Sequence, residues 1–156
     1  MRSVARWLWL AALAGLAAAL VFSAPTGAGT KATRAFVKTA FNKKLHKRIV
    51  VDGNGRTLYM FTADTGGTPT CTPTGVGALC VQLWPPLKSR RKPHAGTGIA
   101  ASKLRVVKRS DGIWQAVYNH HPLYHYSGDS KPGDVRGQKI LGAWYALTPK
   151  GTPIKK

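Results

Sequence analysis

The chain has 156 residues, and its 24 Lys and Arg against 5 acidic residues give a formal net charge of +19. This length suits one modest domain with its own hydrophobic core and excludes two large ones. The chain holds 17 Gly and 10 Pro, which argues against a helix bundle and for short strands joined by loops. All five acidic residues are Asp.

Residues 1–23 have the organisation of a secretory signal. Arg2 and Arg6 precede an uncharged apolar run over residues 7–22, and small residues follow it. An uncleaved anchor helix is the alternative, although the run is slightly shorter than the roughly 20 residues that span a bilayer. We therefore expect an exported chain in which residues 1–23 are a signal peptide or an anchor.

The segment after the expected signal predicts the organisation of the exported part. We expect residues 24–34 to be a linker and residues 35–153 to form the folded domain. No Cys lies near the end of the apolar run, so we expect no lipid on an N-terminal Cys. The exported protein is then extracellular or associated with the cell envelope.

The excess of positive charge persists without the signal. Removal of Arg2 and Arg6 leaves 22 basic and 5 acidic residues, a net charge of +17. Near an anionic surface each Lys or Arg contributes on the order of 1 kcal/mol of attraction, which fades over about 8 Å at physiological salt. We expect the protein to adhere to an anionic envelope polymer or a membrane surface and, without sequence preference, to other polyanions.

The two cysteines, Cys71 and Cys80, predict a disulfide, because export places them in an oxidising compartment. The eight residues between them include Pro and Gly and are flexible enough to let the sulfur atoms meet. Such a closure stabilises a fold by roughly 2–3 kcal/mol. A metal site would need further ligands and shorter Cys spacing.

Two similar seven-residue motifs, which we call the repeated phrases, occur in the chain. They are LYMFTAD over residues 58–64 and LYHYSGD over residues 123–129. An offset of 65 superposes Tyr59 on Tyr124 and Asp64 on Asp129, and an offset of 60 then superposes Trp84 on Trp144. Units of this size bury too little surface to fold alone, so we expect two half-repeats, about 35–90 and 91–153, related by a pseudo-twofold axis.

The local patterns predict β-structure. Residues 48–61 have the pattern of a hairpin, and residues 104–126 that of a three-stranded meander. Within each repeated phrase the aromatic residues alternate with other side chains and should reach one core, and the Asp should hold the turn that follows. The predicted fold is therefore mainly β, a single small domain of two half-repeats with long Gly- and Pro-rich loops.

Residues 31–48 permit two interpretations. Val37, Phe41 and Leu45 are four residues apart, which suits a basic amphipathic helix on a membrane. The stretch AFVKTAF suits an edge strand equally well, and periodicity alone leaves both open.

Three histidines, His120, His121 and His125, lie close together in the sequence HHPLYH. Imidazole groups there could ligate copper, zinc or haem iron. His121 and His125 could share one face of an extended segment, although Pro122 and a turn intervene. These residues are candidates for a metal site, and a solvated loop is the alternative.

Several stretches together resemble the bacterial secreted-repeat proteins with a Tyr-x4-Asp motif, often described as predicted lipoproteins, whose function is not established. These stretches are GRTLYMFTAD, CVQLWPPL, DGIWQAVYNHHPLYHYSGDSKPGDVRGQ and GAWYALTPKG. Tyr59 with Asp64 and Tyr124 with Asp129 both satisfy the motif. The resemblance covers roughly residues 35–151 and favours strands over residues 35–51. The chain departs from the family pattern in having no lipidated Cys and a wider spacing of its two Cys.

No catalytic machinery is predicted. The sequence contains no Gly-x-Ser-x-Gly nucleophile motif and no Gly-rich phosphate loop, and we expect no cofactor. The Asp64 and Asp129 carboxylates could form an acid–base pair at the pseudo-twofold axis, but turn-holding roles are the simpler interpretation. We expect an exported, non-catalytic envelope protein that binds an anionic envelope polymer or an unidentified partner protein. The alternative is a metal- or haem-linked redox protein of the envelope.

Overall fold

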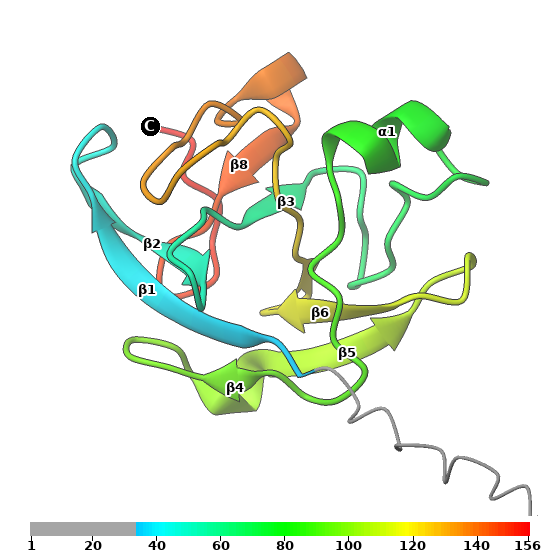
Figure 1. Ribbon diagram of the computed structural model, residues 1–156, viewed down its shortest axis with the longest axis horizontal. Coiled ribbons are helices and arrows are strands. Elements are labelled where there is room, and N and C mark those ends of the chain that lie inside the picture. Colours follow the sequence, from blue (N-terminus) through cyan, green and yellow to red (C-terminus); the bar gives the residue numbers. More distant parts are fainter. Residues whose placement is uncertain (1–33) are drawn as a thin grey trace, which may run out of the picture. The chain divides into compact units, whose positions relative to one another are not determined.

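The computed structural model describes residues 34–156. The expected signal and all but the last residue of the expected linker lie outside the described residues. These described residues belong to one compact unit. The fold is mainly β, as predicted, with three small sheets and one short α-helix in the described part of the chain (Figure 1).

The first half begins with an antiparallel hairpin. Strands β1 (Phe36–Asn42) and β2 (Lys47–Asp52) pair in a register that places Val37 opposite Asp52. The Asn42 side chain closes the turn, because its Oδ1 accepts the backbone N–H groups of Lys44 and Leu45 at 3.1 and 3.0 Å. A short strand, β3 (Tyr59–Phe61), follows. The helix interpretation of residues 31–48 is wrong where the structure describes them, and the strand interpretation is correct. The strand is not at an edge, however, because β1 pairs with β2 on one side and with β4 (His94–Ala95) on the other.

The segment between β3 and the next long hairpin is irregular. It contains α1 (Ala78–Leu83), the two-residue strand β4 (His94–Ala95) and the 3-10 helix η1 (Ala101–Lys103). Strand β4 adds to β1 in parallel, which gives the sheet order β2-β1-β4.

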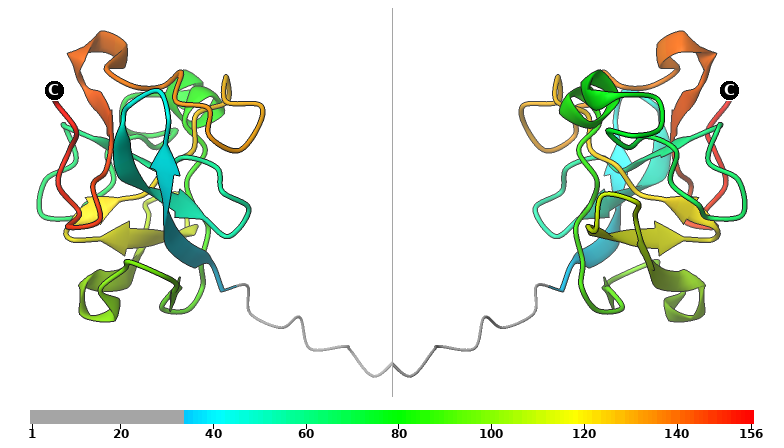
Figure 2. Two further views of the ribbon diagram at one scale, coloured as in Figure 1. Left: turned by 90° about the vertical axis from the view of Figure 1, so that its left-hand side faces the viewer. Right: turned by 90° about the vertical axis from the view of Figure 1, so that its right-hand side faces the viewer.

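The second half repeats the hairpin. Strands β5 (Leu104–Lys108), β6 (Trp114–Tyr118) and β7 (His121–Pro122) form the predicted antiparallel meander. The 3-10 helix η2 (Ile140–Gly142) and strand β8 (Trp144–Ala146) follow. The β1–β2 and β5–β6 hairpins run at a steep angle to each other (Figures 1 and 2).

The two repeated phrases meet each other at the centre of the domain. Tyr59 N donates to Tyr124 O at 2.8 Å, and Tyr124 N donates to Tyr59 O at 3.0 Å, so the two tyrosines form a reciprocal antiparallel bridge. Each tyrosine also faces equivalent residues, since Tyr59 pairs with Ala146 and Tyr124 with Pro86, which are 60 positions apart. These reciprocal pairs are what a pseudo-twofold axis between Tyr59 and Tyr124 produces.

Strand β3 takes its partner from the other end of the chain. The predicted hairpin over residues 48–61 keeps only the contacts next to its turn, such as Leu58 N to Val50 O at 3.1 Å. Beyond that point β3 pairs with β8, so the first half is completed by the last strand. The repeats are therefore interlocked.

Alternation along each repeated strand divides the core into two clusters. Leu58 and Met60 enter one cluster, while Tyr59 enters the other and Phe61 packs against it. The second half behaves alike, because Leu123 belongs to the first cluster and Tyr124 to the second. The predicted delivery of alternate aromatic residues to one core is correct.

Candidate functional site

The residues of the two Tyr-x4-Asp motifs form a reciprocal clamp. The Tyr59 hydroxyl donates to Asp129 Oδ2 at 2.7 Å, and the Tyr124 hydroxyl donates to Asp64 Oδ2 at 2.8 Å. Each tyrosine thus binds the aspartate of the other repeat. The sequence predicts that each Asp acts within its own repeat, and it carries no signal for this exchange.

The second carboxylate oxygen of each Asp holds the loop that follows it. Asp64 Oδ1 accepts the backbone N–H and the hydroxyl of Thr70 at 2.7 and 2.8 Å. Asp129 Oδ1 accepts the backbone N–H of Arg136 at 2.8 Å. Each Asp therefore joins its own long loop to the tyrosine of the partner repeat, which extends the predicted turn-holding role.

Burial favours the protonated form of both tyrosine hydroxyls of the clamp. Both tyrosines are fully buried, and both aspartates are buried. Burial, together with the neighbouring carboxylates, raises the pKa of Tyr59 and of Tyr124 far above the ordinary value, so both hydroxyls remain donors. Burial raises the pKa of Asp64, and this effect outweighs the hydrogen bonds from Thr70 and Tyr124, which lower it. These hydrogen bonds connect the two repeats.

Four aromatic rings stack across the pseudo-twofold axis beside the clamp. The Trp84 and Trp144 rings are stacked with centroids 3.9 Å apart and planes 2° apart. Phe61 stacks on Trp144 at 4.2 Å, and Tyr126 lies against Trp84 at 4.6 Å. Phe61 and Tyr126 are the corresponding aromatics of the two phrases, so the column is itself symmetric.

The predicted disulfide is present. Cys71 and Cys80 are bonded, with their Cα atoms 5.5 Å apart. The bond ties the loop that Asp64 holds to helix α1, and Arg109 Nη2 donates to Cys71 O at 2.8 Å from the β5–β6 hairpin. Asp64, the disulfide and Arg109 thus all hold this loop in place.

The three candidate histidines do not converge. His125 Nε2 lies 3.0 Å from Asp52 Oδ2, whereas His120 is exposed and His121 is half-buried with an Nδ1 atom that has no hydrogen-bond partner. Burial and the neighbouring His120 lower the pKa of His121. Residues 34–156 contain no group of three His, Cys, Asp or Glu side chains placed to hold a metal ion.

All five carboxylates are engaged within the domain. Each accepts hydrogen bonds from its own surroundings, and four of the five residues are buried: Asp52, Asp64, Asp129 and Asp134. The fifth, Asp111, forms a salt bridge of 3.0 Å with the buried Arg109, and the hydrogen bond from this guanidinium holds the Asp111 pKa below its usual range. Arg109 is the one Lys or Arg of the described segment in a salt bridge. The other cations have no carboxylate partner, a feature that composition alone does not reveal.

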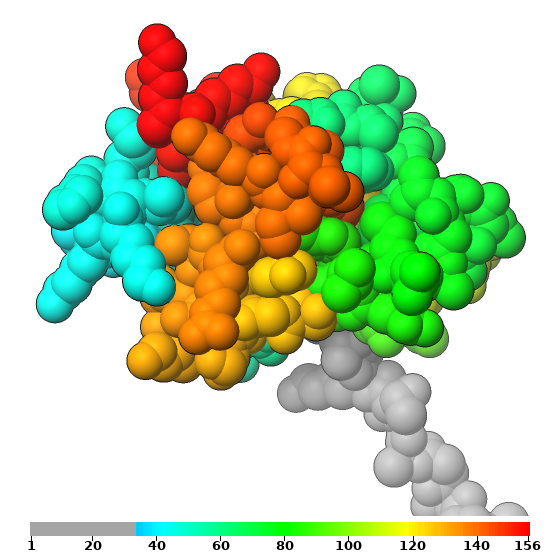
Figure 3. Space-filling model, turned by 90° about the horizontal axis from the view of Figure 1, so that it is seen from above, coloured from blue at the N-terminus to red at the C-terminus, as the bar shows by residue number. Residues whose placement is uncertain are grey.

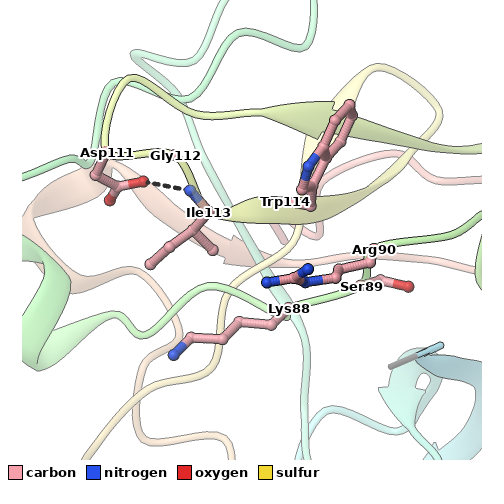
Figure 4. Close-up of a pocket in the computed structure, with 7 residues that line it drawn as sticks. All are labelled: Lys88, Ser89, Arg90, Asp111, Gly112, Ile113 and Trp114. Carbon is pink, nitrogen blue, oxygen red and sulfur yellow. Dashed lines mark hydrogen bonds between the residues drawn. The ribbon is translucent and has the colours of Figure 1, made fainter. Parts of the chain in front are cut away.

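A pocket of about 440 Å³ lies on this cationic surface, between residues 88–90 and the β5–β6 turn. Lys88, Arg90, Ile113 and Trp114 line it, and Figure 4 shows the Lys88 and Arg90 side chains extending along the same side. The strands position these residues, since Ser89 N donates to Trp114 O at 3.0 Å. The pocket therefore combines two unpaired cations with an apolar wall and a partly exposed indole.

The fold and the clamp define a small β domain built of two interlocked repeats. Residues 105–148 match the family described as a secreted repeat of unknown function, and this segment contains the second motif, Tyr124 and Asp129. The resemblance predicted from the motifs is thereby confirmed over residues 105–148. No curated protein and no solved structure matches the chain significantly.

The family match is consistent with export, because the family is described as secreted. Within residues 34–156, no helix combines the length and the apolar character needed to cross a membrane.

Proposed function

We propose that this exported domain is a non-catalytic adhesion module that binds an anionic polymer of the cell envelope. One observation carries the proposal. All five carboxylates bind donors within the domain, so the Lys and Arg side chains of the surface have no opposing charge. A surface of one sign attracts polyanions over about a Debye length, and the attraction weakens as salt increases.

The pocket at Lys88 and Arg90 is the primary contact in this proposal. Two neighbouring cations suit the phosphates or carboxylates of a repeating polymer, and the nearby indole and Ile113 suit the apolar face of a sugar or polyol unit. Asp111 lines the same pocket, but its bond to Arg109 spares the two cations from neutralisation.

Binding to a soluble glycerol-phosphate polymer, to heparin and to duplex DNA, each measured over a series of salt concentrations, tests the proposal. We expect binding to all three, with affinity that falls steeply with salt, by a slope of about −0.9 per DNA phosphate neutralised. Lack of binding at low salt would refute the proposed function.

A matched pair of variants tests the pocket. Lys88→Gln with Arg90→Gln should weaken binding more than Lys155→Gln with Lys156→Gln, which removes the same charge from the exposed C-terminal residues. Equal losses would show that adhesion is diffuse and that the pocket has no special part in it.

The metal- or haem-linked redox alternative stays a prediction, and the separation of His120, His121 and His125 gives it no support. Metal analysis and ultraviolet–visible spectroscopy of the exported protein test it directly.

A further inference from the structure

An apolar end of the domain lies beside the stacked tryptophans. The residues that precede Trp84 form α1, and those that precede Trp144 form η2. Because the two rings stack at 3.9 Å, these segments must lie at the same end of the domain. Both are at the top of Figure 1, and Figure 3 shows them adjoining when that end faces the viewer.

Both segments expose aliphatic side chains at this end. Leu141 in η2 is 91% exposed, and Leu79 in α1 is 71% exposed. Val76 and Leu83, beside and within α1, are 54% and 48% exposed. We call these four residues the apolar tip. Isolated exposed apolar residues are ordinary, but four of them gathered on two symmetry-related segments mark an interaction surface.

The backbone holds Leu141 outward against its own preference. Leu141 has a φ of 51°, and its neighbours Lys139 and Gly142 have φ values of 64° and 61°. The left-handed region is unusual for a bulky residue. The turn is nevertheless fixed, because Lys139 N donates to Trp144 O at 2.8 Å and Ala143 N donates to Ile140 O at 3.0 Å. Strain that the surrounding structure maintains points to a role for the exposed side chain.

Two cations, Arg136 and Lys139, shortly precede Leu141 in the chain. Arg136 and Lys139 are exposed on the same segment as Leu141, and neither forms a salt bridge. A second copy of this chain would bring like charges together, which opposes self-association through this end. Protruding aliphatic side chains next to unpaired cations match the interface of an anionic bilayer, where acyl chains lie below negative headgroups.

We infer that the apolar tip docks the domain on an anionic lipid bilayer, with Leu79 and Leu141 entering the headgroup region and Arg136 and Lys139 contacting lipid phosphates. This surface is separate from the pocket at Lys88 and Arg90. A domain with both surfaces would hold an envelope polymer close to the membrane.

Co-sedimentation of the exported chain with phosphatidylglycerol–phosphatidylcholine vesicles tests the inference. The variant Leu79→Ser with Leu141→Ser should reduce the partition coefficient about tenfold or more, because it removes two apolar side chains from the interface. The control is Phe36→Ser, which changes another exposed apolar residue, located in β1, and should partition as the wild type does. Thermal melting establishes that each variant is folded. Hydrogen exchange on the vesicles should show protection over residues 76–84 and 138–143.

Equal partitioning of the leucine variant and the wild type would overturn the inference, as would vesicle-bound protein without protection of those two segments. Binding of the leucine variant to the glycerol-phosphate polymer should be unchanged. Loss of vesicle binding with polymer binding intact therefore separates this surface from the proposed function.

Discussion

The exchange of partners in the clamp predicts a specific pattern of energetic coupling. The Tyr59 hydroxyl donates to the buried Asp129 carboxylate at 2.7 Å and accepts the Gly137 N–H at 3.3 Å. Tyr59→Phe removes the hydroxyl donor and leaves Asp129 Oδ2 without this hydrogen bond. A buried hydrogen bond to a charged group contributes about 1.5–3 kcal/mol, so we expect the variant to lose about 2–3 kcal/mol of unfolding free energy. Tyr124→Phe should lose a similar amount, because its bond to Asp64 is equivalent.

A double-mutant cycle distinguishes the exchanged clamp from two separate motifs. Tyr59→Phe combined with Asp129→Asn should show a coupling energy of about 1–2 kcal/mol, because the two groups bond directly. Tyr59→Phe combined with Asp64→Asn should be additive to within about 0.5 kcal/mol, although these residues belong to the same motif.

Urea denaturation at neutral pH, with the disulfide intact and the slope of each transition compared, measures all of these values. Strong coupling of Tyr59 to Asp64 with none to Asp129 would refute the exchanged arrangement. Negligible loss for one of Tyr59→Phe and Tyr124→Phe beside a full loss for the other would refute the structural equivalence of the two repeats.

Three further predictions concern residues around the clamp. Burial raises the pKa of Asp52, but the hydrogen bonds from His125 and the backbone outweigh this effect and hold the pKa below its usual value. The stabilisation from this carboxylate is therefore present at neutral pH and should be lost as the pH falls through the lowered pKa. Asp52→Asn should accordingly flatten the acid limb of a plot of unfolding free energy against pH. Replacing Cys71 and Cys80 by Ser should lower stability by about 2–3 kcal/mol, the entropic scale for a loop of this length, as chemical denaturation would measure. The stacked Trp84 and Trp144 rings should give an exciton-coupled circular dichroism signal, and either substitution by Phe should abolish it.

Local features of the chain were predictable from the sequence because they depend on neighbouring residues. Alternation over residues 58–61 and 123–126 identified the side chains that enter each part of the core. It also identified β3, whereas residues 123–126 pair only through isolated bridges at Tyr124 and form no strand of their own. The turns of the meander over residues 104–126 follow from the Asp-Gly and Asn-His sequences between apolar runs. Two cysteines in a chain expected to be exported sufficed to predict the disulfide. The similarity of the two seven-residue motifs revealed the repeat.

The choice of partner could not be read from the sequence, because it depends on how the two halves pack. A Tyr-x4-Asp spacing suits a local turn as well as a link between repeats, and only the antiparallel bridge between Tyr59 and Tyr124 carries each hydroxyl to the opposite Asp. The pairing of β3 with β8 has the same origin, since burying both aromatic faces around one axis requires strands from both ends of the chain.

Tertiary structure also decided what the charges and the exposed residues mean. Composition reports five Asp and an excess of Lys and Arg, but only the folded chain turns every carboxylate toward an internal donor and leaves the cations unopposed. Likewise, Leu79 and Leu141 are distant in sequence and unremarkable in composition. They share one end of the domain because the Trp84 and Trp144 rings stack, and this long-range contact is a property of packing rather than of any local pattern.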